Sequence, residues 1–265
     1  MNNLTKKISP KQNKLQHLLQ DLPLTVSWWQ EIGSTSTAAK KFLQTHLYEQ
    51  PLLFGSDRQT NGYGKKDRKF ISETGGIYLS LLIKIPELTS QNQGLLTTGI
   101  AWELHETIKE ELHTETEIKW VNDLLLNGKK VAGILVEKPQ PQIAIIGIGC
   151  NLYQQQLEEA LPTGTNLLTQ PLTDEQTCHF IAALIHRLFP LTTTFATGTF
   201  LPEYKKHLCL LNQEVTMQIG KTTIVGQAVD LTPQANLVIK TNKGLKTIGA
   251  GEVTKIRPSK KASKN

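Results

Sequence analysis

The segment at residues 57–69 has the composition of an anion-binding loop. It contains Gly62 and Gly64, whose small size lets a backbone approach a ligand closely. It also carries five basic side chains, Arg58, Lys65, Lys66, Arg68 and Lys69. Such a loop can cover a nucleotide phosphate. A solvated surface loop explains the same composition, and the Gly-Lys-Ser/Thr ending of a Walker A loop is not found here.

A lysine within an apolar segment is the second candidate. Lys119 is followed by Trp120, Val121, Asn122 and Asp123. On an alternating strand, Lys119 and Val121 share one face, and Trp120 and Asn122 share the other. A lysine buried beside apolar neighbours needs an anionic partner. The alternative is an edge strand whose lysine extends its ammonium group into water.

Two glycines interrupt an apolar run that ends in a polar residue. Gly147 and Gly149 precede Asn151. Glycines in a strand imply close approach of a ligand or of another backbone, and Asn151 can hydrogen-bond a ligand from the strand end. For the glycines taken alone, the packing of a buried strand is the favoured interpretation.

Helical and strand periodicities predict the elements that position these residues. The predicted helices lie at residues 34–44, 93–113 and 174–190, with another ending near Tyr204. The predicted strands lie at residues 52–56, 76–85, 117–126, 130–137 and 143–150. Asn127-Gly128 between two apolar strands is a strong hairpin signal. These elements indicate an α+β domain in which a mixed sheet packs against helices.

The pattern changes near residue 212. Four short strands are predicted at residues 215–219, 222–231, 237–241 and 245–248. Strands of this length and spacing favour a small β-barrel. The predicted organisation is therefore a basic tail at 1–22, a large domain at 23–211, a barrel at 212–258 and a second basic tail at 259–265.

The net charge of +6 belongs to the two ends of the chain. Residues 1–20 and 253–265 together hold nine basic residues and no acidic one, which leaves 20 basic against 23 acidic residues in the body. Specific nucleic-acid binding needs a basic folded face, so we expect the two polar, mobile tails to aid solubility and expect no specific nucleic-acid partner.

Composition also indicates the class and compartment of the protein. With 38% hydrophobic and 20% charged residues, the chain has the composition of an ordinary globular protein. No signal peptide and no uninterrupted apolar run of about 18 residues is visible, so we expect no membrane association. The three cysteines are odd in number and lack metal-ligand spacing, which predicts a cytoplasmic protein without a metal site of its own.

Four motifs, in this order, resemble those of the biotin–protein ligase family. The resemblance covers nearly the whole span from Val26 to Pro258. The family's Ser-Thr-Asn corresponds to Ser34-Thr35-Ser36, and its Gly-Arg-Gly-Arg-x-Gly-Arg loop, usually preceded by Gln-Thr-x, corresponds to the segment from Gln59 to Arg68. Lys-Trp-Pro-Asn-Asp corresponds to residues 119–123, followed as in the family by residues 130–137. Gly-x-Gly-x-Asn corresponds to residues 147–151.

The resemblance implies a fold, an activity and partners. The fold is the synthetase-like catalytic domain of biotin and lipoate ligases with a C-terminal SH3-like barrel. The activity is ATP-dependent formation of biotinyl-5'-AMP, followed by transfer of biotin to a lysine of a carrier protein such as that of acetyl-CoA carboxylase. Biotin and ATP are the substrates, Mg²⁺ accompanies ATP, and a homodimer is possible.

The resemblance also implies roles for individual residues. Lys119 and Lys65 are the expected catalytic residues, because a cation between carboxylate and phosphate lowers their repulsion. The biotin-binding residues implied by the family are Ser34, Thr35, Ser36, Gln59, Gly62, Tyr63, Gly64, Lys65, Lys119 and Gly133. Those implied for ATP are Lys65, Arg68, Lys119, Asn122 and Asn151.

Several positions depart from the family pattern. Tyr63 and Lys65 replace arginines, Asp67 replaces a glycine, and Val121 replaces a proline. Lysine lacks the planar fork of arginine, which predicts looser phosphate contact at Lys65. Asp67 is expected to tolerate a left-handed conformation. About 22 residues precede the catalytic region, too few for the helix-turn-helix domain that makes some family members repressors, so we expect a ligase without it.

The sequence does not exclude two other functions. A lipoate or octanoate ligase or transferase of the same fold also binds a carboxylate tail, although the loop and the C-terminal domain favour biotin. A non-catalytic biotin-binding module, such as a biotin-responsive DNA binder that uses its basic tails, would bind biotin without consuming ATP.

Overall fold

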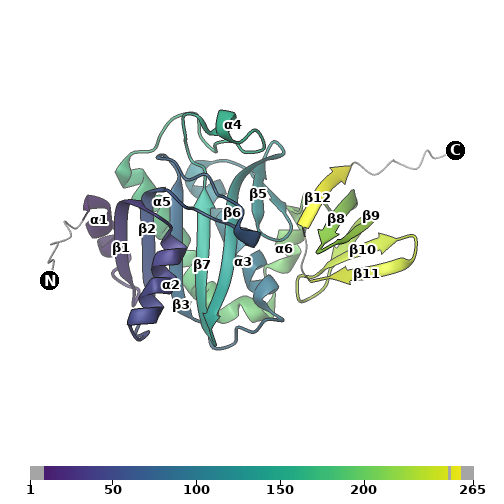
Figure 1. Ribbon diagram of the computed structural model, residues 1–265, viewed down its shortest axis with the longest axis horizontal. Coiled ribbons are helices and arrows are strands. Elements are labelled where there is room, and N and C mark those ends of the chain that lie inside the picture. Colours follow the sequence, from purple (N-terminus) through teal and green to yellow (C-terminus); the bar gives the residue numbers. More distant parts are fainter. Residues whose placement is uncertain (1–8, 250–251, 258–265) are drawn as a thin grey trace.

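The computed structural model describes residues 9–249 and 252–257, and its larger part is a mixed sheet covered by helices on both faces (Figure 1). The strand order is β1–β2–β3–β7–β6–β5–β4. The parallel pair is β1 with β2, and the other neighbours are antiparallel. The strands are β1 Thr25–Ile32, β2 Leu52–Gln59, β3 Ile77–Lys84, β4 Glu117–Lys119, β5 Asp123–Leu126, β6 Lys129–Gln140 and β7 Ile143–Cys150.

Capping side chains mark the starts of α1, α2 and α5, and a proline lies in the first turn of α1 and α6. Ser34 accepts a hydrogen bond from the Thr37 amide at the start of α2, and Thr173 with Gln176 forms a capping box at the start of α5. The helices are α1 Pro10–Leu18, α2 Thr35–Thr45, α3 Gln93–Leu112, α4 Leu157–Ala160, α5 Asp174–Thr194 and α6 Leu201–Lys206. Two 3₁₀ turns, η1 Lys65–Asp67 and η2 Phe195–Thr197, complete the set.

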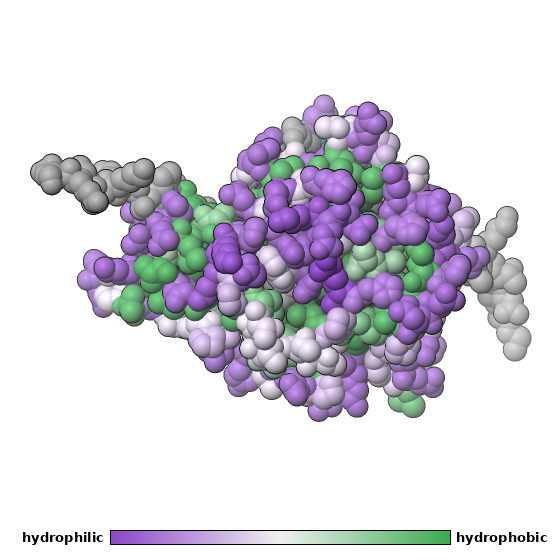
Figure 2. Space-filling view, turned by 180° about the vertical axis from the view of Figure 1, so that it is seen from behind, coloured by the Kyte–Doolittle hydropathy of each residue, from purple (hydrophilic) through white to green (hydrophobic). Residues whose placement is uncertain are grey.

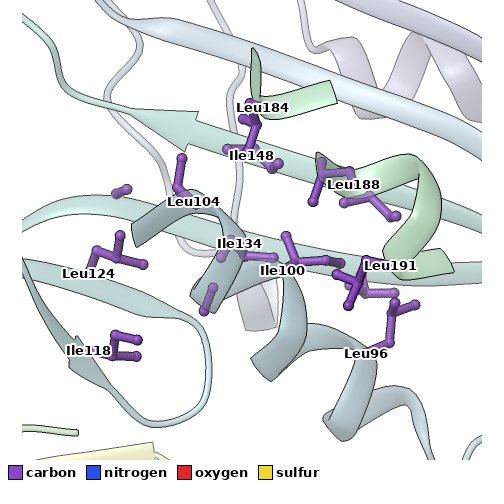
Figure 3. Packing of buried hydrophobic residues seen from close by; sticks show 14 of the residues in the cluster. Leu96, Ile100, Leu104, Ile118, Leu124, Ile134, Ile148, Leu184, Leu188 and Leu191 are labelled. Carbon is purple, nitrogen blue, oxygen red and sulfur yellow. The ribbon is translucent and has the colours of Figure 1, made fainter. Parts of the chain in front are cut away.

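The sheet has a hydrophobic core on each side because its central strands are apolar on both faces. On β7, Ile146 and Ile148 belong to the large cluster formed with α3 and α5, whereas Ile143 and Ile145 belong to a smaller cluster under α2. Figure 3 shows the large cluster, with side chains from α3, α5 and four strands meeting in one layer. The predicted mixed sheet with packed helices is confirmed.

The N-terminal segment differs from the predicted tail. Ser9 caps α1, Pro10 occupies its first turn, and α1 packs against α5. Leu15 and Leu19 are fully buried in the large core. The prediction of a tail at 1–22 is therefore wrong from Pro10 onward. Residues 1–8 and 258–265, which carry the rest of the two predicted tails, lie outside the described residues.

The strand predicted at 117–126 is two strands. Residues 120–122 form a turn between β4 and β5, which then pair with each other in antiparallel register. The predicted hairpin follows, with Asn127 and Gly128 both at positive φ, 52° and 75°, as a tight turn between β5 and β6 requires. The chain thus folds back twice within a short segment around Lys119.

A second, smaller sheet is formed after α6. Its order is β11–β10–β9–β8–β12, with all neighbours antiparallel. Its strands are β8 Glu214–Ile219, β9 Thr222–Leu231, β10 Leu237–Thr241, β11 Gly244–Ile248 and β12 Glu252–Arg257. The four strands predicted from the sequence are present, and β12 is an addition that the sequence analysis missed. The small C-terminal β-sheet domain is therefore confirmed.

One helical stretch is apolar and long. Asp174–Thr197 could span a membrane by length and composition alone, with mean hydropathy 1.2 over its most apolar window. Half of that window is buried, and the helix packs against α1 and α3 in the core. Core helices commonly meet the same criterion, so the burial accounts for its composition. Figure 2 shows that hydrophilic residues cover most of the rear face, with hydrophobic residues in separate groups.

Candidate active site

A cavity of about 530 Å³ is lined by residues of the large sheet and of the small sheet. Its wall combines the start of α2, the segment after β2, strands β3 to β7 and part of β12. The volume falls within the range of about 300–1,000 Å³ that small-molecule sites occupy.

The change from isoleucine to glycine along β7 creates the floor of this cavity. Ile143 and Ile145 fill the space below α2, and the next residues on that face are Gly147 and Gly149. A Cβ at Gly149 would lie 2.5 Å from the Phe70 ring, and one at Gly147 would lie 3.0 Å from Ser36 Oγ. Larger residues at both positions would therefore collide with the cavity wall.

A chain of hydrogen bonds forms the polar end of the cavity at the N-terminus of α2. Gln59 Oε1 accepts from the Thr35 amide at 2.8 Å and from Thr35 Oγ1 at 3.1 Å. Ser80 Oγ lies 2.8 Å from Thr35 Oγ1 and 2.9 Å from Ser36 Oγ. Gln59 Nε2 donates to Ser72 Oγ at 3.0 Å. Buried hydroxyl and amide groups held in this way can recognise a polar, uncharged ring.

The cavity wall is strongly cationic toward the loop and β4. Among the wall residues that the structure describes, the basic ones are Lys65, Arg68, Lys69, Lys119 and Lys130, and the acidic one is Asp123. Lys130 Nζ lies 2.5 Å from Asp123 Oδ1. The Lys119 ammonium makes no hydrogen bond or ion pair with any side chain that the structure describes, so it is available to an anionic ligand.

The segment between Gly62 and Lys69 closes one side of the cavity. Tyr63 Oη donates to Glu137 Oε2 at 3.0 Å, and Lys40 Nζ lies 2.6 Å from Glu137 Oε1. Burial, together with the Glu137 carboxylate, raises the pKa of Tyr63, so its hydroxyl stays protonated and can donate. The Gly64 amide donates to the Arg68 carbonyl at 2.8 Å. The left-handed conformation expected at Asp67 falls on Lys66, at φ 60°.

The small sheet contributes to the same cavity. Val253, Thr254 and Ile256 of β12 are part of its wall. Trp120 is 4% exposed, and its Nε1 donates to the Ala235 carbonyl at 2.8 Å. The turn after Lys119 is thereby hydrogen-bonded to the loop between β9 and β10.

The cavity brings together most of the residues predicted from the sequence. Its wall includes Ser34, Thr35, Ser36, Gln59, Tyr63, Gly64, Lys65, Arg68, Lys119, Asn122 and Gly133. Gly62 lies behind the wall, where a Cβ would be 2.4 Å from Ser72 Oγ. Asn151 also lies outside it, 2% exposed, with its amide bonded to the Lys130 and Thr165 carbonyls and to Gln154.

Other residues of the wall were missed. Phe70 lies just after the motif loop, and Lys130 is the first residue of the motif segment 130–137, so their positions beside or within motifs were the signal available for them. Ser80 lies behind the wall, where it contacts Thr35 and Ser36, and a serine within the apolar strand β3 was the signal for it. The β12 residues lie more than 100 positions from Lys119 in sequence, and nothing local indicated them.

The cysteines do not serve as nucleophiles in this arrangement. Burial raises the pKa of Cys150 to about 12 and that of Cys209 to about 11, and it also raises the pKa of Cys178. A thiol reacts as its thiolate, so these three groups are inert near neutral pH. The chemistry of the cavity therefore depends on its cations and hydrogen-bond donors.

Two family models match the chain. The biotin/lipoate A/B protein ligase family matches residues 28–151, and the biotin protein ligase C-terminal domain matches residues 210–255. Among curated relatives, the bifunctional ligase/repressor BirA of Bacillus subtilis is 27% identical over 241 residues, which are 84% of this chain and 71% of that protein. The biotin–[acetyl-CoA-carboxylase] ligase of Mycobacterium tuberculosis is 25% identical over 76% of this chain and 78% of its own length.

Solved structures are similar over most of the chain. The biotin protein ligase of Aquifex aeolicus in complex with biotin and ATP has a TM-score of 0.74 and 26% identity. The alignment covers 88% of this chain and 99% of that one. The biotin acetyl-coenzyme A carboxylase synthetase of Helicobacter pylori, solved with bound biotinylated ATP, has a TM-score of 0.62 at 19% identity and supports the fold alone.

Proposed function

The chain belongs to the biotin/lipoate A/B protein ligase family, and from this we propose that it is an ATP-dependent biotin–protein ligase. One observation carries the proposal: a cavity joins a chain of buried hydroxyls to a cluster of cations that includes Lys119, whose ammonium pairs with no described side chain. Biotin has a polar uncharged ring at one end and a carboxylate at the other, which suits the two ends of this cavity.

The reaction proceeds in two steps. A carboxylate oxygen of biotin attacks the α-phosphorus of ATP, a new O–P bond forms, and pyrophosphate leaves with the electrons of the bond that breaks. The amine of a carrier lysine then attacks the acyl carbon of biotinyl-5'-AMP, loses a proton and expels AMP. Both steps move negative charge near the phosphate, where fixed cations stabilise the transition state.

Biotin would bind with its ring at the start of α2. Ser34, Thr35, Ser36 and Gln59 supply donors and acceptors for the ureido group, and the glycines of β7 make room for the ring and tail. Gly62 holds the loop close to Ser72, so that Tyr63 and Gly64 cover the tail, and Gly133 lies beside it. The apolar lining from Leu79 and Leu135 fits the alkyl chain of biotin.

The nucleotide would bind at the cationic end. Lys119 lies between the biotin carboxylate and the α-phosphate, while Lys65, Arg68 and Asn122 contact the adenylate. Asn151 acts indirectly, through the backbone of Lys130 that it contacts. Asp123 is the one carboxylate in the described wall and is paired with Lys130, so Mg²⁺ would arrive bound to the ATP phosphates.

Biotin ligases act on biotin carrier proteins, and we propose the carrier of acetyl-CoA carboxylase as the partner of this one. Relatives at 25% identity carry that substrate in their names, which supports the assignment. Cytoplasmic location is a further part of the proposal, since ATP is a substrate and the described cysteines are free thiols. A homodimer and the absence of a specific nucleic-acid partner stay predictions.

Pyrophosphate exchange tests the activity. We expect exchange of labelled pyrophosphate into ATP when biotin is present, and biotinylation of an isolated carrier domain. Lipoate in place of biotin should give neither. Exchange with lipoate and not with biotin would assign the chain to the lipoate branch of the family, and biotin binding without exchange would make it a binding module.

A further inference from the structure

We propose that His105, Glu115 and His207 form a zinc-binding site outside the catalytic cavity. Their ligand atoms all lie within 4.8 Å of one another. One imidazole comes from α3, the other follows α6, and the carboxylate comes from the segment before β4. Two histidines and one carboxylate are a donor set that suits Zn²⁺, with water as the fourth ligand.

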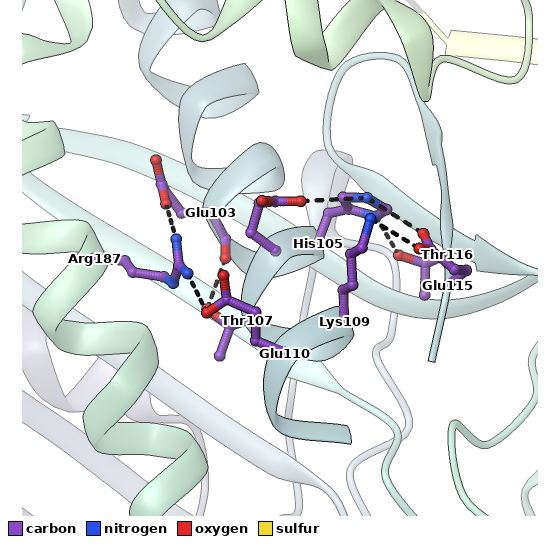
Figure 4. A network of polar contacts seen from close by, with 9 residues as sticks. Glu103, His105, Thr107, Lys109, Glu110, Glu115, Thr116 and Arg187 are labelled. Atoms are coloured by element: carbon purple, nitrogen blue, oxygen red, sulfur yellow. Dashed lines mark hydrogen bonds and ion pairs between the residues drawn. The ribbon is translucent and has the colours of Figure 1, made fainter. Parts of the chain in front are cut away.

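The buried imidazole of His105 supplies the first indication. Its Nδ1 lies 2.8 Å from Thr116 Oγ1, and its Nε2 is buried without a hydrogen-bond partner in the described part of the chain. Buried polar atoms are rarely left unpaired, so each such atom needs an explanation. A histidine that ligates a metal through Nε2 commonly donates its Nδ1–H to an oxygen, and Thr116 provides one (Figure 4).

The other two ligands surround this free nitrogen. Glu115 Oε2 is 4.0 Å from His105 Nε2, and the His207 ring centroid is 4.4 Å from that of His105. Trp102 lies against both imidazoles, with centroid distances of 5.4 and 5.5 Å, and covers one side of the group. The site is thus walled by an indole on one side and reaches solvent at the exposed Glu115.

The three groups need only a small movement to ligate one ion. Tetrahedral zinc with bonds of about 2.0–2.1 Å sets its ligand atoms roughly 3.3 Å apart. The Glu115 side chain is 63% exposed and His207 is half-buried, so both can move inward. Glu115 Oε1 would keep its ion pair with Lys109 at 2.9 Å while Oε2 turns to the metal.

The Glu106 carboxylate is an alternative partner for His105 Nε2. Glu106 Oε1 is 3.9 Å from His105 Nε2, a distance that a single water can bridge. That arrangement would leave His207 without a role, whereas metal binding uses both imidazoles. The zinc site therefore accounts for more of the geometry.

The position of the site indicates a structural role. The Ile118 amide donates to the His207 carbonyl at 2.8 Å, and the Cys209 amide donates to the Ile118 carbonyl at 3.0 Å. Ile118 directly precedes Lys119, and the segment after His207 leads into the small sheet. A metal on Glu115 and His207 would hold the base of β4 against the end of α6 and so stabilise the position of Lys119.

Metal uptake by the untagged full chain, without nucleotide, tests the proposal. We expect equilibrium dialysis against Zn²⁺ to give one ion per chain and the midpoint of thermal unfolding to rise with zinc. His207→Ala and Glu115→Gln should each weaken zinc affinity by about 10–100-fold and lose most of the thermal shift. His179→Ala, which removes an exposed histidine on α5, should keep both properties.

The zinc-uptake and unfolding measurements use no biotin or ATP. Their results therefore test the zinc site independently of the proposed ligase activity. Cobalt bound by the parent chain should show the visible absorption of a tetrahedral ion, which His207→Ala should lose. A parent chain that takes up no stoichiometric zinc overturns the proposal. Equal uptake by His207→Ala, Glu115→Gln and His179→Ala overturns it too, because the ion would then be bound elsewhere.

Discussion

Lys119 combines a fixed backbone with a free ammonium group. Its backbone belongs to β4 and pairs with Asp123, while its side chain lies in the cavity wall and makes no ion pair with any described residue. Lys130, close by, is already neutralised by Asp123. The two lysines therefore differ in what they can offer an incoming anion.

Replacement of Lys119 by alanine should remove adenylation and transfer together. A single preorganised contact to a developing charge contributes about 10²–10³ in rate, so we expect a loss of that size in pyrophosphate exchange. The measurement is exchange at saturating biotin, followed by carrier labelling from preformed biotinyl-5'-AMP. Lys138→Ala, at an exposed position on β6, is the control and should behave as the parent. Near-parental exchange in Lys119→Ala would leave that lysine a structural role only.

The sequence motifs identified several residues of the cavity wall, because neighbouring residues of one motif lie close together in space. Lys119 and Asn122 lie in the cavity as predicted, and so do Thr35 and Gln59. Asn151 does not, because its amide is consumed by the Lys130 and Thr165 carbonyls. A polar side chain at the end of a strand can point into the cavity or away from it. Its direction depends on its neighbours in space, which the motif does not reveal.

The segment containing η1 is attached to the large sheet at Tyr63. Tyr63 bonds to Glu137, which also pairs with Lys40, so the near end of the segment is tied to β6 and α2. Lys65 then begins η1 in the cavity wall, whereas Lys66 lies outside that wall. The segment can therefore cover a ligand while remaining attached to the sheet.

Lys65→Gly should weaken retention of the adenylate more than its formation. Biotinyl-5'-AMP is a reactive mixed anhydride, and the cationic segment that covers its phosphate also excludes water and stray amines. We expect faster release of labelled adenylate during a chase with unlabelled biotin, and labelling of bystander lysines, with exchange largely preserved.

Lys66→Gly is the matched control for this prediction. The residue is one position away, lies outside the cavity wall and has the positive φ of 60° that glycine adopts without strain. It should keep the adenylate lifetime of the parent. Equal lifetimes in all three proteins would remove Lys65 from this role.

Helix α1 is the second element whose contribution can be measured. Leu15→Ala should destabilise the protein by about 2–5 kcal/mol, the usual result of truncating a fully buried leucine. Lys14→Ala, one residue earlier, removes only a solvent-exposed ion pair with Glu175 and should change stability by about 1 kcal/mol or less. Urea unfolding of the two variants provides the comparison. Similar midpoints would mean that α1 is not docked in solution.

The elements themselves were predicted unevenly, for physical reasons. The central strands β3 and β7 are continuous apolar runs, α3 has helical periodicity, and the Asn127-Gly128 turn has specific chemistry, so these were found. The start of α1 was readable at Ser9 and Pro10, but the lysines of that segment suggested a tail. The turn between β4 and β5 and the strand β12 depend on tertiary contacts, which periodicity does not report.

The two sheets are joined by specific contacts as well as by the chain. Trp120 donates to the Ala235 carbonyl, and Lys205 Nζ pairs with Asp230 Oδ1 at 2.6 Å. The first contact is buried, and the second is largely exposed and contributes little. The buried hydrogen bond is therefore the more important of the two for positioning the small sheet.

Trp120→Phe should loosen the small sheet without unfolding the large one. The change removes one hydrogen bond and leaves a buried carbonyl unsatisfied, a combined loss of about 1–3 kcal/mol. We expect faster amide hydrogen exchange in β9 and β10, together with slower adenylation.

Trp28→Phe is the control for burial and shape. Trp28 is also 4% exposed, and its Nε1 has no hydrogen-bond partner among the described residues, so this variant loses packing alone. The difference in amide hydrogen exchange between Trp120→Phe and Trp28→Phe measures the effect of the hydrogen bond to the Ala235 carbonyl. The same exchange pattern in both would show that the hydrogen bond does not hold the sheets together.

The part of the cavity wall that β12 supplies has a consequence for the protein during its synthesis. Translation delivers the chain from its N-terminus, so the large sheet can form on the ribosome well before residues 252–257 emerge. Until β12 pairs with β8, the cavity lacks Val253, Thr254 and Ile256. A nascent chain without β12 therefore has most of the binding groups but an incomplete cavity wall, and we expect it to retain biotinyl-5'-AMP less well than the finished protein.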